Sequence, residues 1–442
     1  MALLLSALAA AALSCPLGCS HAGRCVAGAC VCEPPFGGAA CSELAFDRDR
    51  PGAAALVAPA GSTTWGGSPI ASDDGKSFYI FASLNRNSTI AKFSETGVIV
   101  AARASAPEGP YVLNASASYT LPPRDHKYWD ATFTQNPVVT RLRDGTGFVL
   151  YYAGCAGKGL HWSMGNSSIG TAYGATLEEL ATRPRRPDNP VLEPMPPPHW
   201  EAGGISNPAV WVFADNSVLL AYRGTLDNGI AFASAPTWDG KYERLMGGKR
   251  FFIDMALEDP YLLMSDAGMH VIMHSIRADN CTGVLAKGKG ANDTTGSDCP
   301  NRKKPCTLTG NVGAHAFAPW AANNGSSGGS AAALLDLEQL QLAPLNGSFA
   351  GGYNLSASEG SKAINFSHRE EPKLLWQREH VGAPWRPTHL FNVVIAREAC
   401  AATNPKCDWK YRPSHVHAQP LKADDDVGLR LASDATQASA QG

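Results

Sequence analysis

Acidic residues stand close to a proline in three segments of the chain. Two of the segments, WDATFTQNP and WEAGGISNP, share the order Trp, acid, Ala, four residues, Asn, Pro, which predicts equivalent positions for Asp130 and Glu201 in neighbouring units. The third segment, LEDPY, carries Glu258 and Asp259. Two carboxyl groups across a cleft can hydrolyse a glycosidic bond, because one protonates the leaving oxygen and the other activates water or attacks the anomeric carbon. These acids are the candidate catalytic groups.

Aromatic and polar side chains that suit a sugar gather near the same prolines. The flat faces of tryptophans fit the apolar faces of sugar rings, and Trp65, Trp129, Trp200 and Trp385 all lie just ahead of an x-Pro step. Two histidines, His315 and His389, are expected on inner strands. The predicted substrate-binding residues are Trp65, Ser68, Trp129, Asn136, Trp200, Glu201, Asn207, Asp259, His315 and His389.

Each of these assignments has a structural alternative. Asp130 and Glu201 would then be blade acids that hydrogen-bond backbone groups. Glu258 would pair with Arg369 or Arg386. The tryptophans would be packing residues of the core, and a lone histidine in a sheet is more often a satisfied core residue than a ligand.

The elements that position these residues recur from residue 60 onward. Each unit begins with an x-Pro step and a turn, continues with a short apolar strand and ends with a second strand that has small residues at alternate positions. The first strands are predicted at 78–83, 148–154, 218–224, 269–275 and 389–396, and the second strands at 89–94, 159–163, 229–234 and 313–318. The x-Pro steps begin at Ser68, Asn136, Asn207, Asp259 and Arg386.

This repetition predicts an all-β protein, a β-propeller with five blades. Short strands of period two separated by turns indicate antiparallel sheet, and a repeated small sheet is typical of a propeller. Proline is tolerated at the start of a strand, where no ladder donor is needed. We therefore expect the five residues that precede these prolines at equivalent places, at the mouth of the inner strands. A β-sandwich is the alternative, but it needs no x-Pro step in every unit.

Six of the twelve cysteines fall between Cys15 and Cys41. The order C-x-C, Phe36, Gly37-Gly38, Cys resembles an EGF-like module over residues 15–41. The resemblance implies three disulfides, Cys15–Cys25, Cys19–Cys30 and Cys32–Cys41. A segment this short needs such cross-links, since it cannot bury enough apolar surface to offset its chain entropy. A zinc site is the alternative reading, but paired C-x2-C knuckles are missing.

The other cysteines lie in the larger domain. Residues 276–312 form a Gly-, Asn- and Lys-rich insertion in the fourth unit, which holds Cys281, Cys299 and Cys306, with Cys155 as a candidate partner. Cys400 and Cys407 are predicted to close a local loop.

Several features predict secretion. Residues 1–14 are an apolar run that ends in small residues, as in a signal peptide, and it is too short to span a bilayer. Asn-x-Ser/Thr sequons begin at Asn87, Asn114, Asn166, Asn280, Asn292, Asn324, Asn346, Asn354 and Asn365. The 37 basic and 39 acidic residues give a net charge of −2, which speaks against a nucleic-acid partner. No transmembrane segment is predicted.

The repeated segments resemble the five-bladed propeller glycoside hydrolases, a broad group of arabinanases, xylosidases and fructosidases. The matching segments are QNPVV, SNPAVWVFADNSVLLAYRG, LEDPYL, GAHAFA and REEPKLL with PTHLFNVV. The resemblance implies that Glu258, before a blade-start proline, is the proton donor, with Asp130 as base or pKa modulator. It also implies an aspartate before the first-blade proline, where this chain has Ser68.

The sequence thus predicts a secreted propeller that acts on an oligo- or polysaccharide, with Glu258 and Asp130 as its catalytic residues and no cofactor or metal ion. The alternative is a non-catalytic extracellular module that binds a glycan, or a protein through the EGF-like part. The expected order is a signal peptide at 1–14, the EGF-like module at 15–41, the propeller at 42–415 and a disordered tail at 416–442.

Overall fold

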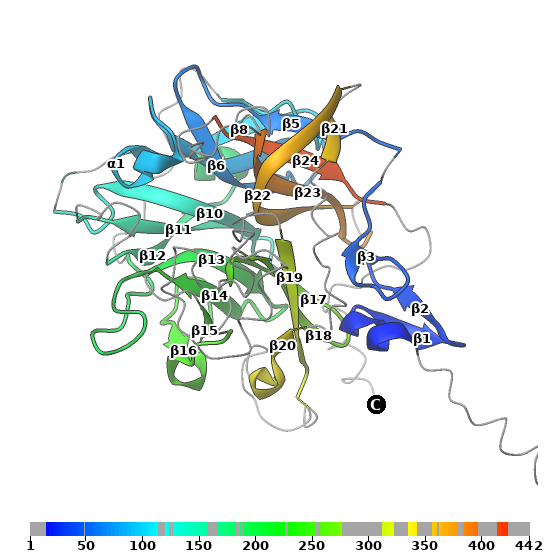
Figure 1. Cartoon of the computed structure of the whole chain (residues 1–442). Helices are drawn as coiled ribbons and strands as arrows, with labels where there is room; N and C mark the ends of the chain where they lie inside the picture. The colour runs from blue at the N-terminus through cyan, green and yellow to red at the C-terminus, as the bar shows by residue number, and fades with distance from the viewer. Residues whose placement is uncertain are drawn as a thin grey trace, which may run out of the picture.

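The computed structural model describes most of the chain (Figure 1). The described residues are 15–47, 49–113, 120–122, 125, 127–157, 166–182, 186, 189–225, 229–252, 257–275, 312–321, 335–342, 356–359, 362–378, 383–396 and 413–422.

Five antiparallel sheets form the blades of a propeller, which confirms the predicted fold class. The inner strand of each blade contacts the inner strand of the next blade, and the fifth contacts the first, so the ring is closed. Apolar side chains pack between neighbouring sheets, for example Tyr151 of one blade with Leu220 of the next. The inner strands are β6 (Thr63–Ala71), β10 (Phe133–Arg141), β13 (Ile205–Val212), β17 (Leu257–Met264) and β22 (Lys362–Gln377).

The outer strands follow in chain order within each blade. The second strands are β7 (Phe78–Asn85), β11 (Phe148–Cys155), β14 (Val218–Gly224), β18 (Gly268–Ser275) and β23 (Arg386–Ala396). The third strands are β8 (Gly97–Ala104), β12 (Ser168–Gly174), β15 (Ile230–Ala235), β19 (Val312–Pro319) and β24 (His415–Pro420). Short edge strands are β9 (Val112–Leu113), β16 (Glu243–Arg244), β20 (Gln341–Leu342) and β21 (Ser356–Glu359).

The fifth blade joins the two ends of the propeller. Strand β5 (Ala53–Leu56) precedes the first blade in sequence but pairs with β24 of the fifth. Because this pairing links the start of the ring to its end, the blades cannot separate at this point without losing sheet hydrogen bonds. The described helices are short: η1 (Pro16–His21), η2 (Ile90–Lys92), α1 (Phe93–Thr96), α2 (Leu177–Thr182), η3 (Leu245–Gly248) and η6 (Leu337–Gln339).

The predicted second strands of the first two units differ from the structure. Residues 89–94 form η2 and the start of α1, and the third strand of that blade is β8. Residues 159–163 lie outside the described residues, and the third strand of the second blade is β12. The strands predicted at 218–224, 229–234, 269–275, 313–318 and 389–396 are confirmed within a few residues at their ends.

The N-terminal module contains the three predicted disulfides, Cys15–Cys25, Cys19–Cys30 and Cys32–Cys41. Its strands are β1 (Gly23–Val26), β2 (Ala29–Cys32), β3 (Phe36–Gly37) and β4 (Glu43–Leu44), which form two small sheets. Phe36 and Leu44 are buried in one cluster with Leu263 of the fourth blade and Leu374 of the fifth. The module is therefore packed onto the propeller and shares its core.

Two buried histidines of the fourth blade face this module. Phe36 lies 5.2 Å from the ring of His270 and 4.9 Å from that of His315, and His270 Nδ1 lies 2.9 Å from His315 Nε2. Burial lowers the pKa of His315 to about 3. Burial also lowers the pKa of His270 well below its usual value, and the neighbouring His315 and His21 act in the same direction. Both rings are neutral at physiological pH, so the contact is an uncharged aromatic one.

We expect acid to destabilise this contact. A histidine with a folded-state pKa below its unfolded value favours folding above pH 6.5, and this contribution is lost as the pH falls from 6.5 toward 3. One pKa unit corresponds to about 1.4 kcal/mol, so with a folded-state pKa of about 3, His315 alone should remove about 2.5 kcal/mol of unfolding free energy between pH 7 and 4.5. Urea unfolding at pH 7 and pH 4.5 checks this, with His315→Gln as the variant that lacks the effect. Equal losses in both proteins would contradict the prediction.

The C-terminal end of the propeller differs from the prediction. The propeller extends past residue 415, because β24 is the third strand of the fifth blade and Leu421 is buried, so the predicted tail at 416–442 begins too early. Residues 1–14, most of the insertion at 276–312, and Cys400 and Cys407 lie outside the described residues.

Cys155 is buried at the end of β11. Among the helices that the structure describes, none has the length and apolar character needed to cross a membrane.

Candidate active site

A bulge in every inner strand aims one residue toward the propeller axis. The register shifts by one residue at Asn136 in β10, Asn207 in β13, Asp259 in β17 and Glu371 in β22. These four residues have φ angles of 52°, 48°, 56° and 53°. A positive φ is uncommon for residues with a side chain and costs about 1–3 kcal/mol, and bulges commonly re-aim side chains next to active sites. The recurrence marks these positions as candidates for function.

Hydrogen bonds connect the four bulge residues across the axis. Asn136 Nδ2 donates to Glu371 Oε1, and Asn207 Nδ2 donates to Asp259 Oδ1 and, at 3.3 Å, to Glu371 Oε1. The backbone N–H of Glu371 donates to Asp259 Oδ2 at 3.2 Å. Asn136, Asn207 and Asp259 therefore occupy equivalent places in their blades, as expected from their x-Pro steps.

The first blade has a glycine at this position. The bulge of β6 falls at Gly66, with φ 56°, and a Cβ on Gly66 would lie 3.4 Å from Glu371 Cδ. Ser68, predicted at this place, lies two residues further along and takes part in the regular ladder. Its Oγ accepts a hydrogen bond from the Val139 N–H at 3.0 Å. The expected equivalence of Ser68 with the other x-Pro residues is therefore wrong, because the bulge of the first blade lies two residues earlier, at Gly66, and no proline follows it.

The fifth blade also uses a different x-Pro step from the one predicted. Arg386-Pro387 opens β23, the second strand, whereas Glu371-Pro372 follows the pattern of the inner strands. Glu371 is 2 % exposed, and its Oε2 lies 3.3 Å from Lys373 Nζ, which is also buried. The equivalent residue is therefore an acid, so the axis carries two carboxylates, Asp259 and Glu371.

In the fourth and fifth blades, the residue before the bulge contacts the second strand of the preceding blade. Glu258 Oε2 lies 2.5 Å from Arg223 Nη1 on β14. Glu370, in the corresponding position of β22, has Oε1 4.0 Å from His274 Nε2 on β18, whose Nδ1 lies 3.3 Å from Asp259 Oδ2. One ligand atom each of Glu258, Asp259, His274 and Glu370 lies within 4.8 Å of the other three. We call these four residues the axial acid cluster.

The pKa values within the cluster are pushed apart. Burial raises the pKa of Glu258, partly against the opposing charge of Arg223, and Asp259 raises it further. Burial acts in the same direction on Asp259, but the proximity of His274, with Lys373 and Arg223, holds the pKa of Asp259 below its usual value. Burial also raises the pKa of Glu370 to about 8. Glu370 is thus protonated at neutral pH, while the lowered pKa of Asp259 keeps that carboxyl ionised.

The donor set of the cluster, three carboxylates and an imidazole, is of a kind that binds divalent cations. Burial acts to lower the pKa of His274, but Glu370, Asp259 and Glu258 together raise it to about 9. The imidazole is therefore protonated at neutral pH and already neutralises part of the acidic charge. A metal would have to displace that proton before His274 became a ligand.

Asp130 and Glu201 occupy equivalent places, as predicted, but these places lie between blades. Asp130 accepts a hydrogen bond from the Tyr152 hydroxyl at 2.9 Å, and Glu201 accepts one from the Tyr222 hydroxyl at 2.6 Å. Both tyrosines belong to second strands and pack in the core between neighbouring blades. Glu201 is fully buried and also binds Arg244.

The aromatic candidates mostly pack the blades. Trp65 is 7 % exposed in a cluster with Phe133, and Trp129 stacks on Tyr152 at 5.6 Å. Trp200 Nε1 donates to the Gly248 carbonyl at 3.0 Å. The histidines predicted on inner strands are on others: His315 is on β19 and His389 on β23.

Sequence reasoning missed His274, Arg223 and Glu370. For each of them the sequence contains a positional signal relative to the bulge. Arg223 and His274 sit opposite the residue before the bulge, in the strand ends AYRG and IMHS. Glu370 precedes the bulge residue Glu371, just as Glu258 precedes Asp259.

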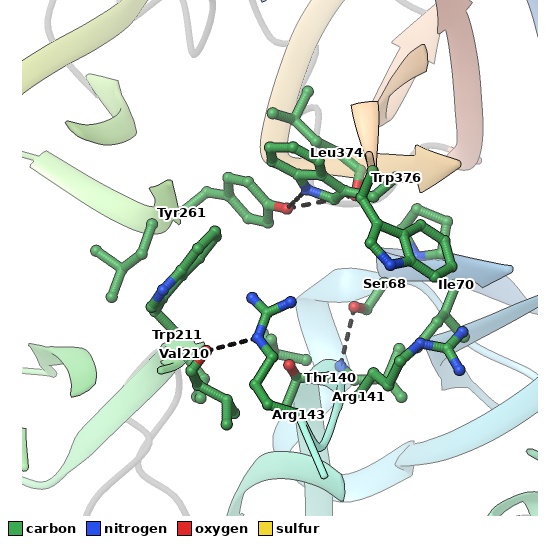
Figure 2. Close-up of a pocket in the computed structure, with 16 residues that line it drawn as sticks. Ser68, Ile70, Thr140, Arg141, Arg143, Val210, Trp211, Tyr261, Leu374 and Trp376 are labelled. Carbon is green, nitrogen blue, oxygen red and sulfur yellow. Dashed lines mark hydrogen bonds between the residues drawn. The ribbon is translucent and has the colours of Figure 1, made fainter. Parts of the chain in front are cut away.

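A pocket lies beyond the bulges, in the second halves of the same inner strands (Figure 2). It has a volume of about 110 Å³, and its wall includes Trp385, together with Ser68. Because strands rise about 3.3 Å per residue, this pocket and the axial acid cluster occupy successive levels along the axis.

No protein-family model matches the sequence, and no curated protein is significantly similar to it. Several solved structures are similar in fold. The catalytic domain of a GH62 α-L-arabinofuranosidase from Coprinopsis cinerea is 13 % identical, with a TM-score of 0.46 over 86 % of this chain and 98 % of that one. An α-L-arabinofuranosidase from Lactobacillus brevis is 12 % identical, with a TM-score of 0.43 over 85 % of this chain and 95 % of that one.

A third structure, an exo-1,5-α-L-arabinanase from a bovine ruminal metagenomic library, is 11 % identical, with a TM-score of 0.39 over 83 % of this chain and 96 % of that one. At these identities the likeness shows the propeller fold alone.

Proposed function

We propose that the protein is a secreted glycoside hydrolase and that the axial acid cluster is its catalytic centre. The proposal rests on the opposite pKa shifts of Glu258 and Asp259, two carboxyl groups with oxygen atoms within 4.8 Å of one another. Pairs of carboxyl groups whose surroundings separate their pKa values are suited to acid and base roles. The reaction class that uses such a pair is hydrolysis of a glycosidic bond.

Glu258 is the proposed proton donor. Its side chain is 14 % exposed, against 4 % for Asp259 and 7 % for Glu370, so it is the most accessible carboxyl of the cluster. Burial raises its pKa, which favours the protonated form that a general acid needs. In the proposed reaction Glu258 protonates the glycosidic oxygen as the bond to the anomeric carbon breaks.

Asp259 is the proposed ionised partner. A separation below about 5.5 Å leaves no room for a water molecule between two carboxyl groups and is typical of retaining enzymes, in which the second group attacks the anomeric carbon. Asp259 would form the covalent glycosyl intermediate, and Glu258 would then remove a proton from the water that hydrolyses it. His274 and the Asn207 amide hold the Asp259 carboxylate in place.

Asp130, the base predicted from the sequence, can be tested separately. Its hydrogen bond to Tyr152 favours a structural role between blades, so we expect Asp130→Asn to retain activity within about tenfold. A loss of about 100-fold or more in kcat, with unchanged unfolding free energy, would instead support Asp130 as the base. Steady-state kinetics together with urea unfolding of the same preparation makes this comparison.

The function itself is tested with the purified, secreted full chain. A panel of aryl glycosides and plant or algal polysaccharides, assayed for released aglycone and reducing ends, should yield at least one substrate. Measuring the anomer first formed by NMR would check the retaining outcome. Absence of turnover on the whole panel, with binding to one of its glycans, would favour the second candidate.

That second candidate is a non-catalytic glycan-binding propeller. The observation that favours it is the short ion pair between Glu258 and Arg223, because a carboxylate paired with arginine resists protonation. In this case the axial acid cluster would hold the blades together. An extracellular protein would be the other partner, through the N-terminal module, whose Val26 is 49 % exposed.

Secretion is supported by the three disulfides, which persist in oxidising compartments. Two of the predicted sequon asparagines, Asn87 and Asn166, are exposed in the structure and are open to glycosylation.

A further inference from the structure

The pocket in the second halves of the inner strands carries a cation that the proposed reaction does not use (Figure 2). Strands from all five blades contribute to its wall, through the segments 68–70, 138–141, 210–212 and 261–262 and the residues Leu374 and Trp376. The charged residues of this wall are Arg141 and Arg143, and none of the lining residues is an aspartate or glutamate. The pocket is thus positively charged.

Arg143 is fixed so that part of its guanidinium faces the pocket. Its Nε donates to the Val212 carbonyl at 2.9 Å, and its guanidinium carbon lies 5.2 Å from the ring centre of Trp211. Figure 2 shows the two terminal nitrogens pointing toward the middle of the pocket. A guanidinium presents donors in a planar fork that matches a carboxylate in two parallel hydrogen bonds.

The other arginines nearby are already engaged. Arg141 forms an ion pair with Asp73 and lies between the rings of Phe148 and Trp385, at 4.6 and 4.9 Å. Arg378 donates to the Asp73 carbonyl and also lies over Trp385. Burial, with the positive charges of Arg378 and Arg143, lowers the pKa of Arg141 to about 10. An anion beside Arg143 would relieve this repulsion.

The remaining wall suits a ring with both apolar and hydroxyl-bearing surfaces. Trp211 and Trp376 form a corner, with ring centres 6.4 Å apart and planes at 70°. Trp376 Nε1 donates to the Tyr261 hydroxyl at 2.8 Å, which keeps the indole in place. Ser68 and Thr140 add hydroxyl groups to the opposite side (Figure 2).

We propose that this pocket binds a uronic acid, with the sugar carboxylate on the Arg143 guanidinium and the ring against the corner of Trp211 and Trp376. The ligand is either a free uronic acid or the uronate at the end of an oligosaccharide. The site is separate from the axial acid cluster, and it does not depend on whether that cluster is catalytic.

Calorimetric titration of the full chain tests the site, with tryptophan fluorescence as a second readout. The probes are D-galacturonate, D-glucuronate and a trimeric oligogalacturonide, each beside its neutral counterpart, galactose, glucose or a galactose oligomer, at constant ionic strength. At least one uronate should bind saturably, and its neutral counterpart should bind about 100-fold more weakly, since a charge-assisted bidentate pair is lost. Tighter binding of the trimer than of the monomers would identify the chain end as the ligand.

Arg143→Gln should weaken uronate binding about 100-fold, whereas Arg103→Gln is the matched control. Arg103 also lies over an aromatic ring, at 5.7 Å from Tyr79, but it is exposed on the first blade. If Arg143→Gln does not fold, Trp376→Phe offers a milder change in the same wall, which should weaken binding several-fold. Glu258→Gln should bind uronate like the parent protein.

Several outcomes would overturn the proposal. They are the absence of saturable uronate binding, equal affinity for the neutral sugars, or unchanged affinity in folded Arg143→Gln. Tighter binding of benzoate than of every uronate would show that the pocket takes an aromatic acid and would likewise exclude the uronic acid assignment.

Discussion

Glu258→Gln should lower kcat/KM about 10²- to 10⁴-fold on glycosides with poor leaving groups, the range typical of a lost general acid. The loss should be less than about tenfold on dinitrophenyl glycosides, because their leaving group departs without a proton. A structural role for Glu258 would reduce both rates equally. The split between the two substrate classes is therefore the measurement that separates proton donation from simple misfolding.

A matched control removes another paired acid. Glu338 pairs with Lys249 at the surface and has a side chain that is 73 % exposed, so Glu338→Gln should leave both rates unchanged. Urea unfolding of both variants shows whether the propeller is intact. If folded Glu258→Gln hydrolyses every substrate as fast as the parent, the assignment of the proton donor is wrong.

The pH dependence of kcat gives a second, independent test of Glu258 as the proton donor. The donor must be protonated, so activity falls as the pH rises through the pKa of Glu258, which burial has raised. The positive charge of Arg223 opposes that rise. Arg223→Gln should therefore shift the alkaline limb of the kcat profile to higher pH, whereas a non-catalytic Glu258 would leave the limb where it was.

The blade pattern could be predicted from the sequence because each second strand combines an apolar run with a turn just before it. The predicted strand at 89–94 is wrong for a local reason: TIAKFS has an alternating pattern, but it forms short helical turns, and the strand follows at once in β8. Period-two alternation over six residues does not distinguish these two structures without the pairing partner.

The site could be predicted only in part, because a bulge is a property of strand pairing. The fifth blade has two x-Pro steps, and only the register shows that Glu371, and not Arg386, reaches the axis. The first blade has its bulge at Gly66 without a following proline, so the x-Pro step at Ser68 does not mark the position of the bulge. His274 and Arg223 come from second strands, and their approach to Glu258 depends on how neighbouring blades pack.

Glu201 illustrates how the same acid fits either a substrate role or a structural one. Its carboxylate is fully buried, and it accepts hydrogen bonds from Arg244 Nε at 3.0 Å, from Arg244 Nη2 at 2.6 Å and from the Tyr222 hydroxyl. Burial alone would lower the pKa of Arg244, but Glu201 and Tyr222 raise it above its usual value. The Glu201 carboxylate and the Arg244 guanidinium therefore stabilise each other, and removing one should destabilise the other.

Arg244→Met should therefore lower the free energy of unfolding by about 3–5 kcal/mol, because it leaves a buried carboxylate without its counter-charge. Glu201→Gln combined with Arg244→Met should recover part of that loss, since the double variant has no unpaired buried charge. Urea unfolding of the parent, both single variants and the double variant measures the coupling. Arg103→Gln, an exposed control, should change stability by less than about 0.5 kcal/mol. A small loss of stability in Arg244→Met together with weaker glycan binding would mean that Glu201 and Arg244 contact the substrate. A pair that serves only the packing of the third blade cannot change affinity while leaving the fold equally stable.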